Sequence, residues 1–434
     1  MKLARSLLAL SFLLLLGAAG PCEQPPPATP DAGTTPPGPD AATPADAATM
    51  PPPSHCTTAT HAPISSDPTV AALASATAAF RASLNPTLLA QASFCLEDDE
   101  LPSWSFLPVF VAGRKGVQFS DLSPAQLDLA YAVFAGFLST QGYDRLYLII
   151  NTLDEMMRMQ WGGFGFGAGL YHISLFNDPA TDGAWGIQID GHHLAITFVV
   201  DGDHVYTTPA FFGGQPNVIG GVKVFGGEES AAFAFVAALS SEHLTRALTA
   251  VKAPNDVVTA PGNGGPDAAR NFDYTQFVHV GLAAADMTAS ERQKLRALIA
   301  QVVSYQHGSF AAAKMAEIDA VFDETWFTWM GPTDGSGRFY FRVYSPKILI
   351  EYDLSTVVGE ATDHTHMLIR SPDQGDFGPF ALRTPSLEQH LRSDPDHRRE
   401  RERTALRMDV RRPSAALAAR LAELVARHQR RAHI

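Results

Sequence analysis

Helical and strand-like patterns occupy separate blocks of this chain, and this separation constrains the fold more than any other feature. Apolar residues recur at helical spacing between Asp67 and Met157, whereas after Trp161 they alternate with a period of two. Helical spacing returns over residues 228–251, 290–305 and 311–322, and strand patterns resume from Trp326 to Arg370. Separate blocks favour an α+β fold over an alternating α/β fold. We therefore predict N-terminal helices and an antiparallel β region with helices packed against it, in a single large domain.

Proline, glycine and polar residues mark the expected ends of these elements. Asp67-Pro68 and Ser123-Pro124 are typical helix starts, and Gly142 is predicted to break the helix that Ser123 opens. The segment from Asn255 to Asn271 is rich in Gly, Pro, Asn and Asp, which predicts a long exposed loop or lid. Strands are predicted over residues 171–176, 185–189, 194–200, 205–212, 326–330, 338–345, 347–352 and 364–370.

The two ends of the chain differ in composition from the middle. Lys2 and Arg5 precede an apolar run that is too short to span a bilayer and fits an export signal. The Pro/Ala/Thr-rich stretch after it cannot bury enough apolar surface to order itself. These patterns divide the chain into an export signal (1–21), a disordered spacer (22–58), a folded α+β domain (59–398) and a basic helical tail (399–434).

The cysteines indicate a compartment outside the cytoplasm. Cys22 directly follows the apolar run, where an acylated thiol would anchor a lipoprotein in a membrane; ordinary cleavage after Ala19 is the alternative. Cys56 and Cys95 are then an even pair, for which an oxidising compartment predicts a disulfide, with two buried free thiols as the alternative. The predicted location is the periplasm or the cell surface.

Charge is distributed unevenly along the chain. The net charge is -13, yet the stretch from Arg383 to Ile434 holds 13 Arg and no Lys against 7 Asp and Glu. An acidic body argues against nucleic acid as the main partner. The predicted partner is a small-molecule substrate or ligand, and the oligomeric state stays open.

Two histidine clusters carry the strongest chemical signal. His364 and His366 are two residues apart in a predicted strand, so both imidazoles project from one face. Paired neutral imidazoles suit a divalent transition metal such as zinc, copper or iron. His192 and His193 are adjacent, so strand geometry allows only one of them to face the same point. All four histidines are candidate metal ligands, and structural roles for them are the alternative.

Polar residues of the last strands add candidate catalytic groups. Glu351 is a candidate ligand or general base, and Arg342 is a candidate anchor for an anionic substrate. An ion pair between Arg342 and Glu351 or Asp353 is the structural alternative.

The run from Gly163 to Gly169 superficially fits the dinucleotide fingerprint. That fingerprint needs a strand before it and a helix after it, and here the order is reversed, so we predict no nucleotide site there.

Further motifs surround these residues along the chain. They include Trp104, Arg114-x-Gly116, Leu138-Ser-x-x-Gly142-Tyr143, Gly191-His-His193, Pro209-Ala-Phe-Phe-Gly-Gly-Gln-Pro216, Phe327-x-Trp329-x-Gly331, Tyr340-x-Arg342, Ile350-Glu-Tyr-Asp353, His364-x-His366 and Asp376-Phe-Gly378. Together they resemble domain-of-unknown-function family 3500, bacterial proteins without an established activity, from about residue 65 to about residue 398. The resemblance implies a single unit with a polar site. Phe339 stands where a histidine is expected from this resemblance, and Asp363 where an asparagine is expected.

Three functional hypotheses follow from these features. The first is an exported metal-dependent enzyme, hydrolase-like, whose metal is held by His364, His366 and either His192 or His193. The second is a non-catalytic lipoprotein that binds a ligand or a metal at the surface of the cell. The third is a domain whose histidines have only structural roles. Large distances between residues 192, 364 and 366 would favour this third hypothesis over the first two.

Overall fold

The computed structural model describes Cys56 and residues 63–259, 279–354, 363–372, 376–378 and 380. All of these residues fall within one compact unit, in agreement with the predicted single domain. The predicted export signal and basic tail, and the spacer apart from Cys56, lie outside the described residues, so the predicted domain boundaries stay predictions. No helix in the described part of the chain is long and apolar enough to cross a membrane.

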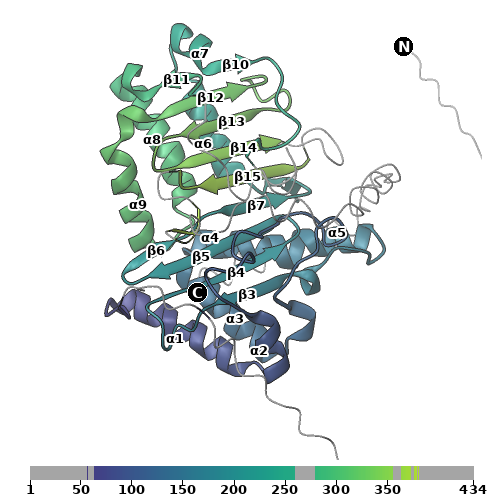
Figure 1. Ribbon diagram of the computed structural model, residues 1–434. Coiled ribbons are helices and arrows are strands. Elements are labelled where there is room, and N and C mark those ends of the chain that lie inside the picture. The colour runs from purple at the N-terminus through teal and green to yellow at the C-terminus, as the bar shows by residue number, and fades with distance from the viewer. Residues whose placement is uncertain are drawn as a thin grey trace, which may run out of the picture. The chain divides into compact units, whose positions relative to one another are not determined.

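A 13-stranded sheet forms the centre of the fold (Figure 1). Its main path, in spatial order, is β1 (Ser93–Phe94), β3 (His172–Phe176), β4 (Ala184–Gly191), β5 (Leu194–Asp201), β7 (Ala210–Gly214), β15 (Thr365–Arg370), β14 (Leu349–Leu354), β13 (Tyr340–Tyr344), β12 (Trp326–Met330) and β10 (Leu248–Ala250). The strands β2 (Val117–Gln118), β6 (His204–Tyr206) and β11 (Leu282–Ala283) pair beside this path, and β8 (Val218–Ile219) and β9 (Val222–Lys223) form a separate hairpin.

The sheet is antiparallel except at its two ends, where β1 pairs with β3 and β10 pairs with β12 in parallel. The α+β prediction is therefore confirmed, with parallel pairing as an addition at the edges. The last strand, β15, lies between β7 and β14 in the middle of the sheet. This insertion leaves only β7 between the C-terminal part of the described chain and the β4–β5 hairpin, which is far away in sequence.

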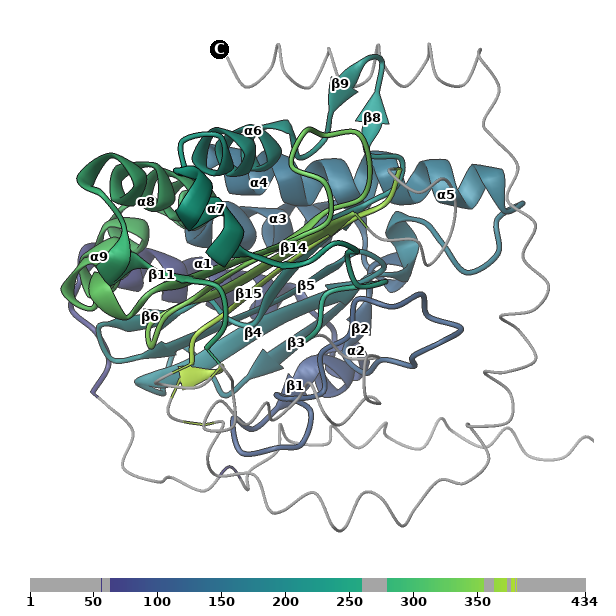
Figure 2. The ribbon, with the colours of Figure 1, turned by 90° about the horizontal axis from the view of Figure 1, so that it is seen from above.

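Most of the helices cover one face of the sheet. The helices of the described chain are α1 (Pro68–Ser83), α2 (Pro86–Ala92), α3 (Pro124–Phe137), α4 (Thr140–Leu148), α5 (Asp154–Gln160), α6 (Gly226–Val236), α7 (Ser241–Ala247), α8 (Ala289–Val303) and α9 (Gly308–Ala320). Seen from above, α4, α6 and α8 lie on the same side of the strands (Figure 2). The predicted starts are confirmed, since Asp67 caps α1 and Ser123 forms a capping box with Gln126 at α3.

The two faces of the sheet differ in what they bury. On β14, Ile350 and Tyr352 point into the large core beneath the helices. The opposite face carries a smaller core, which includes Phe211 and Leu368 and is closed by loops such as the one around Phe106. Polar residues of β13, β14 and β15 share this second face because strand residues alternate. The sheet therefore places the candidate site under loops, on the side away from the main helical layer.

Three sequence predictions are corrected by the structure. Gly142 does not end a helix but lies inside α4, because its missing side chain lets the helix approach the backbone of Tyr305. The predicted strand 205–212 is divided into β6 and β7, and the residues between them include Pro209, which has no N–H to donate to a neighbouring strand. The predicted helical stretch 228–251 is divided into α6 and α7 and ends in strand β10. In the described part of the predicted exposed loop, Asn255 and Val258 are exposed, whereas Val257 and Thr259 are buried. Its part from residue 260 onward lies outside the described residues.

A disulfide joins Cys56 to Cys95, with the two Cα atoms 5.3 Å apart. The predicted pairing is therefore confirmed, and the alternative of two free thiols is excluded. Structural disulfides persist in oxidising compartments, so the bond fits a location outside the cytoplasm.

Stability is expected to fall in mild acid because of His172 on β3. Burial lowers the pKa of His172 to about 4, and the nearby Arg114 guanidinium contributes to this shift. The unfolded chain binds this proton near pH 6.5, so stability is lost as the pH falls from about 6.5 to about 4, by about 3 kcal/mol. The free energy of unfolding, measured by urea titration, should differ less between pH 7 and pH 4.5 in His172→Gln than in the parent. An unchanged difference would contradict this assignment.

Candidate metal centre

The β4–β5 hairpin turn presents His193 to the site. Gly191 pairs with Leu194, so His192 and His193 form a two-residue turn. His193 has a φ of 63°, a conformation in which Asn, Asp and His are the commonest non-glycine residues. Its N–H donates to the Phe106 carbonyl at 2.9 Å and its carbonyl accepts from the Gly213 N–H at 2.7 Å. These bonds hold in place the backbone from which the imidazole projects.

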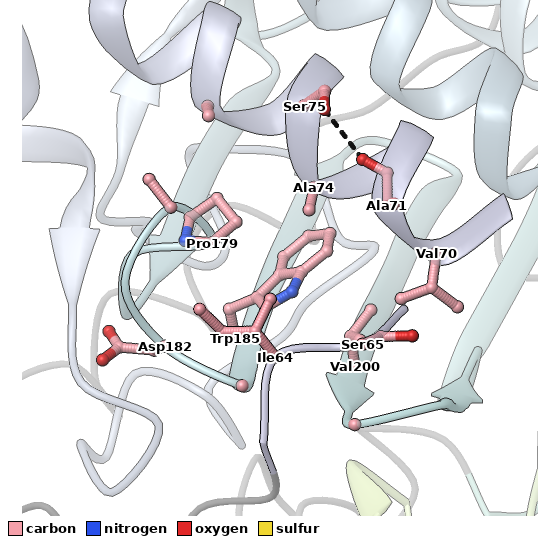
Figure 3. A pocket seen from close by; sticks show the side chains of 14 residues that line it. Ile64, Ser65, Val70, Ala71, Ala74, Ser75, Pro179, Asp182, Trp185 and Val200 are labelled. Carbon is pink, nitrogen blue, oxygen red and sulfur yellow. Dashed lines mark hydrogen bonds between the residues drawn. The ribbon is translucent and has the colours of Figure 1, made fainter. Parts of the chain in front are cut away.

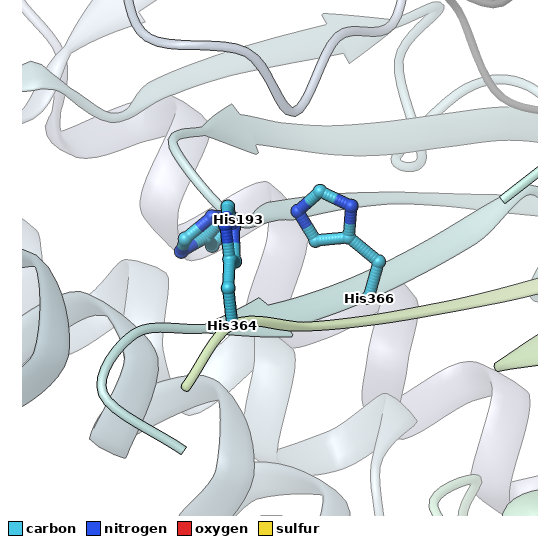
Figure 4. A group of neighbouring side chains, drawn as sticks. All are labelled: His193, His364 and His366. Atoms are coloured by element: carbon cyan, nitrogen blue, oxygen red, sulfur yellow. Dashed lines mark hydrogen bonds between the residues drawn. The ribbon is translucent and has the colours of Figure 1, made fainter. Parts of the chain in front are cut away.

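The start of β15 supplies the other two imidazoles. His364 lies directly before the strand and His366 is its second residue. His193, His364 and His366 each offer a ring nitrogen, and the three nitrogens lie within 4.8 Å of one another (Figure 4). The Nε2 atoms of His193 and His364 are 2.7 Å apart. The structure thus joins residues that are separated by 171 positions in sequence.

This cluster has the composition and depth of a transition-metal site. His193 and His366 are each only 3% exposed, and His364 is 4% exposed. Burial lowers the pKa of His193 well below its usual value, and the neighbouring imidazoles lower it further, which keeps this ring neutral with a lone pair to donate. Tetrahedral ligation at 2.0–2.1 Å implies about 3.4 Å between nitrogens, so His193 and His364 need to separate by some tenths of an ångström to hold zinc.

A hydrogen bond joins Asp256 to His366. Nδ1–H of His366 donates to Oδ1 of Asp256 at 2.6 Å, which assigns the lone pair to Nε2. Nε2 is buried and has no hydrogen-bond partner among the described residues. Phe106 and Phe211 contact the same ring edge-on, with centroids at 5.4 and 5.0 Å. A buried nitrogen with a lone pair, set between apolar walls, suits metal ligation.

His192 occupies a different environment from His193. Its ring stacks on that of His193 at 3.8 Å between centroids, but its Nδ1–H donates to Oδ1 of Asp154 at 2.6 Å. Asp154 follows a π-helical turn, Ile149–Leu153, and its other oxygen accepts from the Gly167 N–H. His192 does not belong to the three-histidine cluster. It supports the turn and lies next to the candidate centre.

Glu351 and Arg342 lie on the histidine face but outside the cluster. The two residues are directly opposite each other on β14 and β13. Glu351 is fully buried, and its oxygens accept from the N–H groups of Val258 and Thr259, each at 2.9 Å, and from the Tyr340 hydroxyl. Glu351 is therefore committed to protein donors, and its predicted role as a ligand or base is untested.

Asp376, of the motif Asp376-Phe-Gly378, forms a buried ion pair with Arg370 at 2.6 Å.

An apolar pocket lies elsewhere in the fold (Figure 3). It is lined by α1 residues such as Val70 and Ala74 and by Trp185 and Val200 of the sheet. None of the candidate site residues is among those that line it. The pocket and the histidine cluster are therefore distinct features.

Asp154 and Asp256 are the site residues that sequence reasoning missed. Asp256 stands in a segment rich in turn-forming residues, where an aspartate carries no distinctive signal. Asp154 lies among helical residues and resembles a solvated helix carboxylate. The one available signal was the presence of histidines that would require carboxylate partners.

The fold and the site together define a single-domain α+β protein with a buried three-histidine cluster beneath its loop-covered sheet face. The family model described as a protein of unknown function, DUF3500, matches residues 66–379, and the chain belongs to this family. No curated protein and no solved structure matches the chain. The resemblance predicted from the motifs is confirmed, and it brings no activity with it.

The two departures from the expected family pattern do not remove a ligand from the cluster. Phe339 is buried in the helix-side core and stacks on Trp329 at 4.8 Å, so a side chain at this position points away from the histidines. Asp363 accepts from the Asn217 N–H at 3.1 Å and holds the chain directly before His364.

Proposed function

We propose that this protein binds a divalent transition metal through His193, His364 and His366 and acts as a metal-dependent, hydrolase-like enzyme. The observation that carries the proposal is the convergence of three buried ring nitrogens within 4.8 Å. Three protein ligands leave a tetrahedral metal one position for water, which is the arrangement of catalytic zinc sites. A metal so bound lowers the pKa of its water and makes hydroxide available near neutral pH. Zinc, copper and iron all accept imidazole ligands.

The proposed substrate is a small, anionic molecule. Arg342 supports this choice because it shares the sheet face of His366 and lies two strands away. A guanidinium binds carboxylate or phosphate through paired hydrogen bonds. The disulfide supports export to the periplasm or cell surface, where acylated Cys22 would attach the chain to a membrane.

A non-catalytic metal- or ligand-binding protein is the second candidate. The deep burial of the histidines favours it, since each is less than 5% exposed. A metal with an open position reached by water distinguishes the enzyme from a closed storage or structural site.

Elemental analysis of the full-length protein tests the proposal. We expect near-stoichiometric metal in the parent and its loss in the double variant His364→Ala, His366→Ala, because two of three ligands are removed. The matched control is His204→Ala, His307→Ala, which removes two imidazoles outside the cluster and should retain the metal. Circular dichroism confirms that each variant is folded. A parent without metal, even after incubation with zinc, copper and iron, would refute the proposal.

A further inference from the structure

The segment from Asp256 to Thr259, called the strap below, is attached to the polar face of the sheet by two buried charged side chains. The Glu351 carboxylate accepts hydrogen bonds from the backbone N–H groups of Val258 and Thr259 and from the Thr259 hydroxyl. Arg370 donates from Nη1 to the Thr259 carbonyl at 2.7 Å. The strap is therefore tied to β14 through a carboxylate and to β15 through a guanidinium.

The strap carries the carboxylate that orients His366. Asp256 lies three residues before Thr259, and Val257 between them is fully buried in the smaller core that includes Leu368. Because its backbone is anchored on both strands, the strap holds Asp256 at 2.6 Å from Nδ1 of His366. A carboxylate in this position selects the tautomer with its lone pair on Nε2 and raises the basicity of that nitrogen.

Hydrogen-bond donors of the protein occupy the acceptor positions of the Glu351 carboxylate. Oε1 accepts from Val258 and from the Tyr340 hydroxyl at 2.5 Å, and Oε2 accepts twice from Thr259. Four donors occupy the two carboxylate oxygens, which is the full capacity of the group. Glu351 can therefore affect the histidines through the strap while donating no oxygen to a metal.

We propose that Asp256 is a positioning residue for His366 and that Glu351 and Arg370 set its place by holding the strap. The inference rests on the proposed metal site and deepens it, because it makes the metal affinity of the cluster depend on Glu351 by way of Asp256. In this proposal Glu351 acts indirectly, in contrast to the role as a ligand or base that the sequence predicts.

A double-mutant cycle on zinc affinity separates these two roles. Affinity is measured by competition with a chromophoric chelator, using the full-length protein. Asp256→Ala is expected to lower zinc affinity 10- to 100-fold, the usual effect of losing a carboxylate partner of a ligand histidine. Glu351→Gln should lower it roughly 10-fold. The double variant should bind zinc no more weakly than Asp256→Ala alone, whereas additive losses would make Glu351 a ligand and overturn the inference.

Two further variants test whether a loss of zinc affinity is caused only by disturbed folding. If Glu351→Gln does not fold, Thr259→Val removes one donor to the same carboxylate. It should weaken zinc binding in the parent but not in the Asp256→Ala background. Glu317→Gln, a control on α9 away from the strap, should leave the affinity unchanged. Equal zinc affinity in Asp256→Ala and the parent would also overturn the inference.

A metal-free measurement distinguishes failure of the inference from failure of the proposed function. In protein labelled with ¹⁵N-histidine, imidazole NMR should report the Nδ1–H tautomer for His366 in the parent and loss of this preference in Asp256→Ala. A parent that binds no zinc would refute the metal proposal while this spectrum still decides whether Asp256 orients His366. An Nε2–H tautomer in the parent would overturn the inference.

Discussion

Replacing His193 by glycine is expected to weaken zinc binding by about 100- to 1000-fold. Structural zinc sites with four ligands bind with about 10–16 kcal/mol, so each ligand contributes about 2.5–4 kcal/mol. Glycine is the appropriate replacement because His193 has a φ of 63°, which glycine adopts without strain. The backbone bonds from His193 to Phe106 and Gly213 can therefore persist after the imidazole is removed. Chelator competition measures the effect.

His192→Gln is the matched control for this prediction. The two residues share one turn, but His192 donates to Asp154, and glutamine retains a donor for that carboxylate. We expect zinc affinity to change by less than about 10-fold, since His192 supports a ligand and is not one. If His192→Gln lost as much affinity as His193→Gly, or more, then His192 would be the ligand and the assignment would be wrong.

The contrast between these two histidines shows what the sequence could and could not predict. For His364 and His366, a spacing of two and a strand pattern were sufficient, because alternation places both on one face. His192 and His193 lie in the two-residue turn of a hairpin, where alternation no longer applies. Choosing between them requires the positive φ of His193 and the position of Asp154, both of which depend on tertiary contacts.

The carboxylates illustrate a second limit of sequence reasoning. Glu351 stands out in sequence because it interrupts an apolar strand, yet the strap occupies its oxygens. Asp256 carried no signal in the sequence, although its carboxylate accepts a hydrogen bond from His366 of the cluster. Most strands and helix starts were predicted correctly, since they follow from local periodicity and capping residues. The site depends on the placement of β15 between β7 and β14, which is a non-local choice.

Gly142 is a case in which packing outweighs local preference, and Gly142→Ala is expected to destabilise the domain by about 3 kcal/mol. Alanine favours a helix over glycine by about 1 kcal/mol. However, its Cβ would lie 2.1 Å from the Tyr305 carbonyl oxygen, a backbone atom that cannot rotate away. Moving α4 aside would cost about 1–3 kcal/mol in overpacking. It would also break the bonds from Ser139 to the Tyr305 and Ser304 carbonyls, worth about 1 kcal/mol each.

Gly136→Ala in α3 provides the comparison that isolates this backbone contact. Its Cβ would meet only the end of the flexible Leu73 side chain, at 2.7 Å, which can shift to another rotamer. We therefore expect the free energy of unfolding of Gly136→Ala, measured with urea, to differ from that of the parent by less than about 1 kcal/mol. The helix preference of alanine offsets the adjustment of Leu73. If Gly142→Ala were as stable as Gly136→Ala, the close approach of α4 to Tyr305 would not be what requires glycine at position 142.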